Sequence, residues 1–150
     1  MQNLELGFIG FGLIGGSIAR SIKKKNGHYK IKVYTRRKNP HLEQGVEEGV
    51  IDELLYDIGE PFSSCDIIFL CAPVLKNLEF LPLLKPLVKP SCIITDVGSV
   101  KGSICRTAAS LGLDTRWQVP KKPDMKILRI FYWRMLIISL LLTKRTARKI

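Results

Sequence analysis

The sequence predicts an α/β fold in which a doubly wound, parallel sheet carries helices on both faces. Strand-like apolar runs alternate with segments of helical periodicity over the first 116 of its 150 residues. Two of these runs, residues 66–72 and 92–97, are almost continuously apolar, which is typical of parallel strands buried on both faces. A glycine-rich turn follows the first strand, and a helical pattern begins directly after it.

The elements follow from the order of these patterns. The first helix begins near Leu13, because Leu13, Ile14, Ile18 and Ile22 can share one face. Gly49 is a plausible stop for the second helix. The third helix is expected to break near its prolines. We expect strands at residues 4–9, 31–35, 66–72 and 92–97, and helices at residues 13–22, 41–48, 74–84 and 103–111.

The composition fits one domain, and the charge is unevenly distributed. The formal net charge is +11 and the hydrophobic content is 46%. Residues 1–116 carry 15 basic and 12 acidic side chains, whereas residues 117–150 carry nine basic and one acidic. The basicity therefore belongs to the tail, which weakens the case for a nucleic-acid partner.

Several protein classes are disfavoured by the sequence. The four cysteines include no C-x-x-C pair, and with two histidines they predict reduced thiols and no metal site. The longest apolar stretch, residues 127–142, is interrupted by Arg129 and Arg134 and is too short to span a membrane. No secretory signal precedes the first strand. We therefore expect a cytoplasmic protein without a membrane segment.

The glycine-rich turn has the spacing G-x-G-x-x-G between a strand and a helix, the context that supports dinucleotide binding. The first glycine permits a tight turn, the second lets backbone approach a pyrophosphate, and the third allows close packing of helix on strand. The helix then presents free N–H groups and its positive dipole end to that phosphate. The turn residues expected to bind the cofactor are Gly10, Phe11, Gly12, Leu13, Ile14 and Gly15.

The end of the second strand bears on the choice between NAD and NADP. About 20 residues beyond the last glycine, where a carboxylate would bind a ribose 2′-hydroxyl, the sequence has Thr35, Arg36 and Arg37. The two arginines could hold a 2′-phosphate, which favours NADP. A solvated basic loop is the alternative reading.

Two more segments fall outside the carboxyl ends of predicted strands. In the first, the small residues among Cys71, Ala72, Pro73 and Val74 could let backbone approach the nicotinamide ribose. In the second, residues 95–102, Ser99 could hydrogen-bond a substrate or cap the following helix. Asp96 is expected to order this turn rather than to transfer protons.

Together these motifs resemble the prephenate dehydrogenase family. The resemblance rests on GFIGFGLIGGS at 7–17, CAPV at 71–74 and TDVGSVKG at 95–102, and covers about residues 4–116. It implies a Rossmann-type domain that binds NAD or NADP. It also implies oxidative decarboxylation of prephenate to 4-hydroxyphenylpyruvate in tyrosine biosynthesis, with Ser99 as a catalytic-site contact to the substrate.

The sequence departs from the family in two respects. The family's catalytic histidine lies in a His-Pro-Met-Ala-Gly segment, which this sequence lacks; its only histidines are His28 and His41. The helical domain that completes the substrate pocket and forms the homodimer is also missing. We therefore expect a truncated chain that binds cofactor and is inactive alone.

Residues 117–150 resemble nothing in the family, and a shifted reading frame explains them. The segment can be back-translated and each codon's last base read with the first two bases of the next codon. With permitted codon choices this gives family-like sequence, and the genetic code alone fixes some of its residues. The pair Trp117–Gln118 must give Ala, and Met125–Lys126 must give Glu. The predicted domains are thus residues 1–116 and an out-of-frame tail; a genuine basic helix is the alternative.

Other functions remain open. Arogenate dehydrogenases share the motifs, and other 3-hydroxy-acid dehydrogenases share the glycine-rich turn. A non-enzymatic nucleotide-binding module with a basic tail is the third possibility, and it would bind nucleic acid in a salt-sensitive way.

Overall fold

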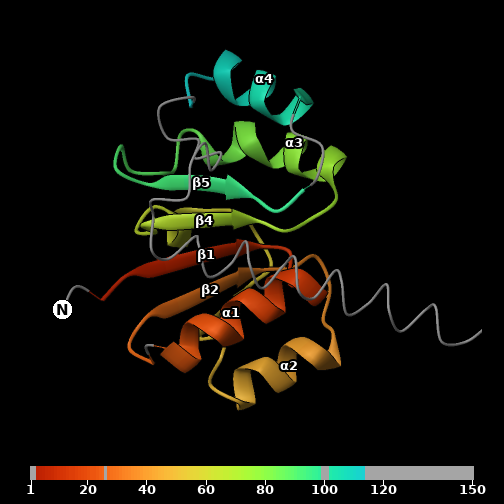
Figure 1. Cartoon of the computed structure of the whole chain (residues 1–150), viewed down its shortest axis with the longest axis vertical. Coiled ribbons are helices and arrows are strands. Elements are labelled where there is room, and N and C mark those ends of the chain that lie inside the picture. The colour runs from red at the N-terminus through yellow and green to blue at the C-terminus, as the bar shows by residue number, and fades with distance from the viewer. Residues whose placement is uncertain (1–2, 26, 99–101, 114–150) are drawn as a thin grey trace, which may run out of the picture. The chain divides into compact units, whose positions relative to one another are not determined.

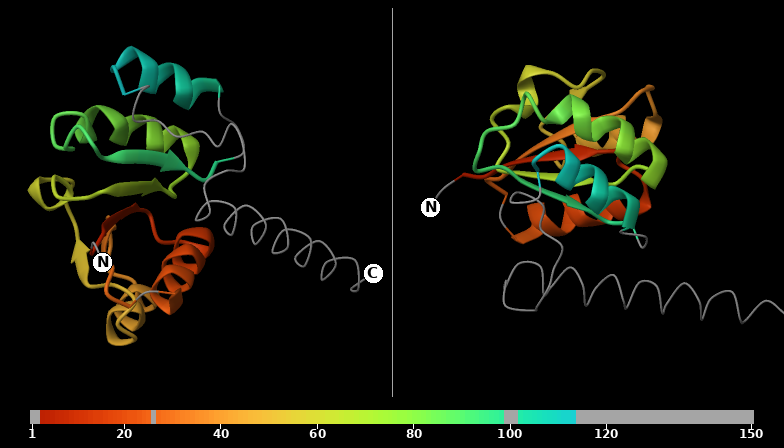
Figure 2. Two further views of the ribbon diagram at one scale, coloured as in Figure 1. Left: turned by 60° about the vertical axis from the view of Figure 1, so that its left-hand side comes forward. Right: turned by 90° about the horizontal axis from the view of Figure 1, so that it is seen from above.

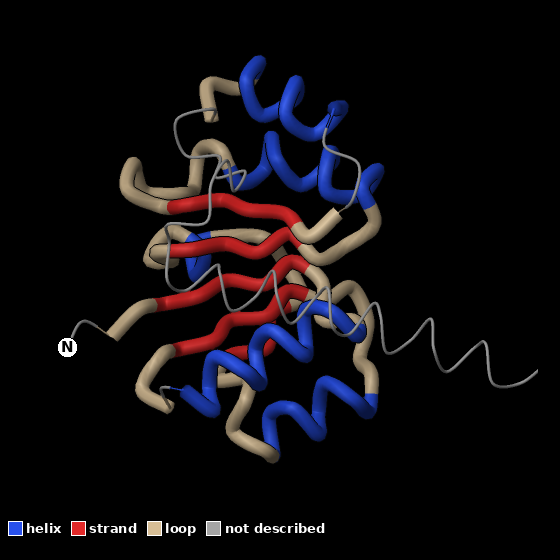
Figure 3. Tube along the Cα trace, viewed as in Figure 1, coloured by secondary structure: helices blue, strands red, loops and turns tan. Residues whose placement is uncertain are grey.

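The computed structural model describes residues 3–25, 27–98 and 102–113, and they form a parallel sheet flanked by helices (Figure 1). The five strands are β1 (Glu5–Ile9), β2 (Lys30–Tyr34), β3 (Glu53–Leu55), β4 (Ile67–Leu70) and β5 (Ile93–Asp96). Their order in the sheet is β3-β2-β1-β4-β5, so β1 is central (Figure 3). The chain passes from the edge strand β3 back to β4, which places a topological switch point between β1 and its neighbour β4.

The connections between the strands are helical. They are α1 (Leu13–Lys25), α2 (Pro40–Glu47), the short 3-10 helix η1 (Glu60–Phe62) and α3 (Val74–Leu84), and α4 (Gly102–Ser110) follows β5. Helices α1 and α3 lie on opposite faces of the sheet (Figure 2). The doubly wound parallel fold predicted from the sequence is therefore confirmed.

Each face of the sheet has its own apolar core. On one face, Phe8 stacks on Phe69 with ring centroids 4.8 Å apart, and buried residues of α1 pack nearby. Successive side chains of a strand point to opposite faces of the sheet. The neighbours of Phe8 and Phe69 along their strands therefore pack on the other face, against η1, α3 and α4. The members of this second core include Ile9, Phe62, Ile68, Leu70, Leu81, Leu84, Ile94 and Ile104.

The expected elements are all present. The edge strand β3 and the helix η1 were not expected. Helix α3 ends at Leu84, between Pro82 and Pro86, so its predicted range of residues 74–84 is confirmed. Leu13 is 73% exposed and Ile14 41% exposed, so they do not share the buried face of Ile18 and Ile22. The physical reason is the helical period: Leu13 is nine residues, or two and a half turns, before the buried Ile22 and so lies on the opposite side of α1.

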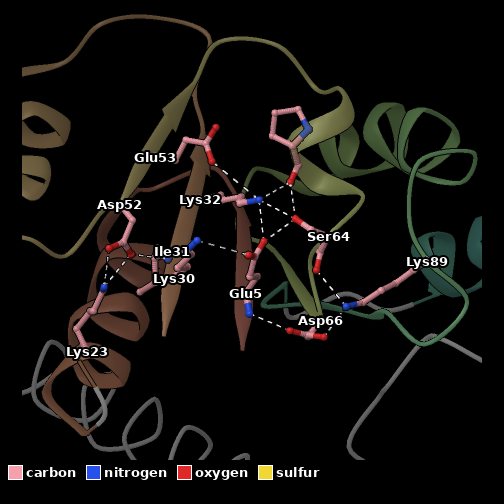
Figure 4. A network of polar contacts seen from close by, with 11 residues as sticks. Glu5, Lys23, Lys30, Ile31, Lys32, Asp52, Glu53, Ser64, Asp66 and Lys89 are labelled. Carbon is pink, nitrogen blue, oxygen red and sulfur yellow. Dashed lines mark hydrogen bonds and ion pairs between the residues drawn. The ribbon is translucent and has the colours of Figure 1, made fainter. Parts of the chain in front are cut away.

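Carboxylates cover the amino ends of the two central strands (Figure 4). Asp66 accepts a hydrogen bond from the Glu5 backbone N–H at 2.8 Å and from Lys89 Nζ at 2.6 Å. Asp52 accepts from the Ile31 N–H at 2.6 Å and pairs with Lys23 at 2.7 Å. The N–H groups at the amino ends of these strands therefore have hydrogen-bond acceptors within the protein itself.

Lys32 is a buried cation in the same network. It is only 8% exposed, and its Nζ lies 2.8 Å from Glu5 Oε2. It also donates to the Pro61 carbonyl at 2.8 Å and to Ser64 Oγ at 2.7 Å. Hydrogen bonds from Lys32 and Ser64 lower the pKa of Glu5 below its ordinary value of 4.5. The contacts of Lys32 therefore connect β2, on which it lies, with β1 and with the segment before β4.

The Glu5–Lys32 pair makes stability depend on pH. Because the folded pKa of Glu5 is lowered, its contribution is present above the unfolded-state pKa and is lost as pH falls through the folded pKa. We expect Glu5→Gln to lower the free energy of unfolding at neutral pH, because the buried Lys32 then loses its nearest carboxylate and keeps only Glu53, at 3.9 Å. Denaturant unfolding from about pH 7 to about pH 3 should show the two stability curves converging in acid.

Glu47→Gln is the matched control, since Glu47 is exposed on α2 and has no ion-pair partner among the described residues. It should keep the wild-type curve. A Glu5→Gln curve that runs parallel to the wild type down to low pH would contradict this role of the pair.

Candidate functional site

The carboxyl ends of the strands, at the right of Figure 1, border an open cleft of about 590 Å3. It lies where β1 meets β2 on one side and β4 on the other, which is the switch point of the sheet. Its lining comes from the turn after β1, the end of β2, the segment after β4 and helix α3. The lining residues are Gly10, Tyr34, Thr35, Arg36, Arg37, Ala72, Pro73, Lys76 and Phe80.

The turn after β1 is packed directly against the segment after β4. Gly10 has a φ of 91°, and a Cβ there would lie 3.0 Å from the Ala72 backbone N. A Cβ on Gly15 would lie 2.8 Å from the Gly10 carbonyl oxygen and 3.2 Å from Cys71 Cβ. Only glycine at these two positions allows α1 to begin so close to the ends of β1 and β4.

Gly12 differs from the other two glycines because it faces open space. A Cβ built on it would have no neighbour within 4 Å, although its carbonyl accepts the Gly16 N–H at 2.8 Å. The first turn of a helix has N–H groups without intrahelical partners, and its dipole favours an anion. No acidic residue stands in the first turn of α1. This corner of the site is therefore open and suited to a negatively charged group.

The end of β2 forms a basic rim. Thr35 Oγ1 donates to the Arg37 carbonyl at 3.0 Å, which fixes a turn, and Arg36 and Arg37 are exposed. Neither arginine forms an ion pair with another residue of the described ranges. None of the residues lining the cleft is acidic. The charge of the cleft is therefore positive.

Three lining residues were missed by the sequence reasoning: Tyr34, Lys76 and Phe80. Tyr34 and Phe80 meet edge to face with centroids 5.3 Å apart, and Phe80 is 9% exposed. Lys76 and Phe80 lie four residues apart on α3, so a helical reading of residues 74–84 beside the strand end could have found them. Aromatic rings thus border a cleft that carries basic side chains at its rim.

The remaining predicted residues lie around the cleft or outside the described ranges. Burial raises the pKa of the Cys71 thiol to about 12, so it packs as a protonated side chain. Asp96 Oδ2 accepts the Gly98 N–H at 2.9 Å, and this bond orders the turn as expected. Seven predicted residues stand on the two βα turns but do not line the cleft: Phe11, Gly12, Leu13, Ile14, Gly15, Cys71 and Val74. Ser99 lies outside the described residues.

The histidines and cysteines carry no site in the described residues. His28 is exposed in the turn before β2, at the amino ends of the strands and so away from the cleft. His41 is exposed on α2. None of the four cysteines forms a disulfide. Across residues 3–25, 27–98 and 102–113, no three metal-ligating side chains gather. No helix in this part of the chain is long and apolar enough to cross a membrane.

The chain resembles known proteins in sequence and structure. A prephenate dehydrogenase from Lactococcus lactis is 34% identical over 109 residues, which are 72% of this chain and 30% of that protein. The structure of Aquifex aeolicus prephenate dehydrogenase with hydroxyphenyl propionate and NAD+ matches with a TM-score of 0.68 and 30% identity. That match covers 78% of this chain and 41% of the other. Synechocystis arogenate dehydrogenase matches with a TM-score of 0.64 and 33% identity, over 72% of this chain and 37% of that chain.

The chain thus spans about a third of the length of the curated relatives it matches. The family model for the nucleotide-binding domain of prephenate dehydrogenase matches residues 18–123. This match begins after the glycine-rich turn, so the geometry of that turn is an independent observation. The chain belongs to the family of prephenate dehydrogenase nucleotide-binding domains.

Proposed function

We propose that this domain binds NAD or NADP as the nucleotide-binding part of a dehydrogenase that acts on prephenate. The observation that carries the proposal is the cleft, where the glycine-rich turn, the basic end of β2 and the segment after β4 come together. The solved relative from Aquifex aeolicus, which is in complex with NAD+, supports it.

The residues of the cleft fit a dinucleotide. The open backbone at Gly12 and the first turn of α1, with Phe11, Leu13 and Ile14, would hold the pyrophosphate. Tyr34 and Phe80 offer an apolar border for the adenosine half. The segment at 71–74, from Cys71 to Val74, would lie along the nicotinamide half. The bound nicotinamide would supply the hydride acceptor.

NADP is the preferred cofactor in this proposal. A domain selective for NAD has a carboxylate at the end of the second strand, and here that place holds Thr35, Arg36 and Arg37. The guanidinium groups are exposed and have no acidic partner among the described residues. They are therefore available to a 2′-phosphate.

Prephenate is the proposed substrate, and its oxidative decarboxylation gives 4-hydroxyphenylpyruvate. Relatives with this activity by name, and the fairly specific segment at 95–102, support it. Ser99 would contact the substrate. Arogenate is the second candidate, because the Synechocystis relative is an arogenate dehydrogenase. Neither histidine lines the cleft, so we assign no catalytic base to the described residues.

The dinucleotide proposal is tested with Gly12→Ala. A Cβ at Gly12 has open space in the free chain, so the variant should fold as the wild type does. It should bind NADP and NAD roughly tenfold or more weakly, since the methyl group occupies the space that a pyrophosphate needs. Binding is measured by calorimetric titration of the 150-residue chain.

Gly27→Ala is the matched control, because its Cβ also meets nothing within 4 Å. It should bind both nucleotides normally. If Gly12→Ala and Gly27→Ala bind as tightly as the wild type, the turn is not the pyrophosphate site.

The cofactor preference is tested with Arg36→Ala and Arg37→Ala. Each should weaken NADP binding by about tenfold and leave NAD binding nearly unchanged, because only NADP has the 2′-phosphate. Arg106→Ala, an exposed arginine of α4 outside the cleft, is the control. Equal losses for NADP and NAD would show that the arginines serve the cleft as a whole and not the 2′-phosphate.

We also propose that residues 117–150 are read out of frame from a gene whose neighbouring frame continues the family sequence. These residues lie outside the described part, and the family match reaches only the first seven of them, residues 117–123. Resequencing of the locus should find family-like sequence in the adjacent frame beyond codon 116. An intact frame ending at Ile150 in independent isolates, with no such neighbouring sequence, would refute this explanation.

A further inference from the structure

The cleft contains a third cation that the end of β2 does not supply. Lys76 stands in the first turn of α3 and lines the cleft together with Arg36 and Arg37. The strand order places β2 and β4 on either side of β1, so these cations come from both flanks of the cleft. Three of its lining residues are basic, and none is acidic.

Lys76 differs from the two arginines because it has an acidic partner. Its Nζ lies 2.7 Å from Glu79 Oε1 and 2.8 Å from Glu79 Oε2, one helical turn further on. The lysine side chain is 43% exposed and the glutamate 58%. An ion pair this exposed is weak because water screens it, so another anion can replace the carboxylate.

We propose that Lys76 is a specificity-determining residue that binds the 2′-phosphate of NADP and that Glu79 competes with the phosphate for it. This inference rests on the proposed dinucleotide function. A phosphate dianion offers more charge and more acceptor oxygens than a carboxylate, so the ammonium exchanges partners when NADP binds. NAD has no phosphate at this position and leaves the Lys76–Glu79 pair intact.

The pair therefore sets how strongly the cleft distinguishes the two cofactors. With Glu79 present, part of the attraction of Lys76 for the phosphate is used to break the pair. Without Glu79, the ammonium is available at once. The two residues should consequently act in opposite directions on NADP binding, and neither should affect NAD.

The first test is Lys76→Gln, which keeps most of the aliphatic side chain and removes the charge. NADP should bind roughly fivefold more weakly to the 150-residue chain, while the affinity for NAD stays within about twofold. Lys85→Gln is the matched control, because Lys85 is exposed at the end of the same helix and does not line the cleft. Circular dichroism melts confirm that each variant is folded.

The second test is Glu79→Gln, which should strengthen NADP binding by about twofold and leave NAD unchanged. In the double variant with Lys76→Gln, this gain should disappear, because Glu79 acts only through Lys76. Equal effects of Lys76→Gln on both cofactors, or a gain from Glu79→Gln that persists in the double variant, would overturn the proposal.

The wild-type titration separates the two levels of inference. If the chain binds both cofactors and Lys76→Gln leaves their affinity ratio unchanged, the role of Lys76 is wrong and the dinucleotide function stands. If the wild-type chain binds neither cofactor, both are wrong.

Discussion

The site depends on one close approach, that of the turn after β1 to the start of the segment after β4. Gly15 leaves no room for even a methyl group between the first turn of α1 and the carbonyl of Gly10, and Gly10 itself lies against the backbone of Ala72. This contact brings the first turn of α1 to the switch point of the sheet. A larger residue at either position would move the helix away, and the cleft would lose the surface that suits a phosphate.

The amino ends and the carboxyl ends of the strands differ in how their charges are balanced. At the amino edge, carboxylates and lysines neutralise one another: Asp52 and Asp66 accept strand N–H groups, and Glu5 pairs with the buried Lys32. At the carboxyl edge, the lining of the cleft is basic and has no acidic member. Charge is thus balanced where it stabilises the fold and unbalanced where an anion would bind. The large positive charge of the sequence comes mainly from residues 117–150 and has no part in this contrast.

The sequence was sufficient to predict the central elements because their signals are local. Continuous apolar runs identify β4 and β5, and the glycine spacing identifies the turn between β1 and α1. It did not predict β3, whose three residues at the sheet edge are too few for a hydrophobic pattern. Nor did it predict the exposure of Leu13, because Leu13 was grouped with Ile22 although nine residues, or two and a half turns, place the two on opposite sides of the helix. Lys76 and Phe80 were missed although they lie four residues apart on a predicted helix that follows a strand end, which is the signal that could have placed them at the cleft.

The central claim is that a dinucleotide occupies this cleft, and amide NMR of the labelled chain during titration with NADP tests it most directly. The account predicts that the largest shift changes fall on the amides of Gly10, Gly12 and Gly15, and next on those at 35–37, 72 and 74–76. Changes confined to the amino edge around Glu5 and Lys32, or no saturable change at millimolar NADP, would contradict it.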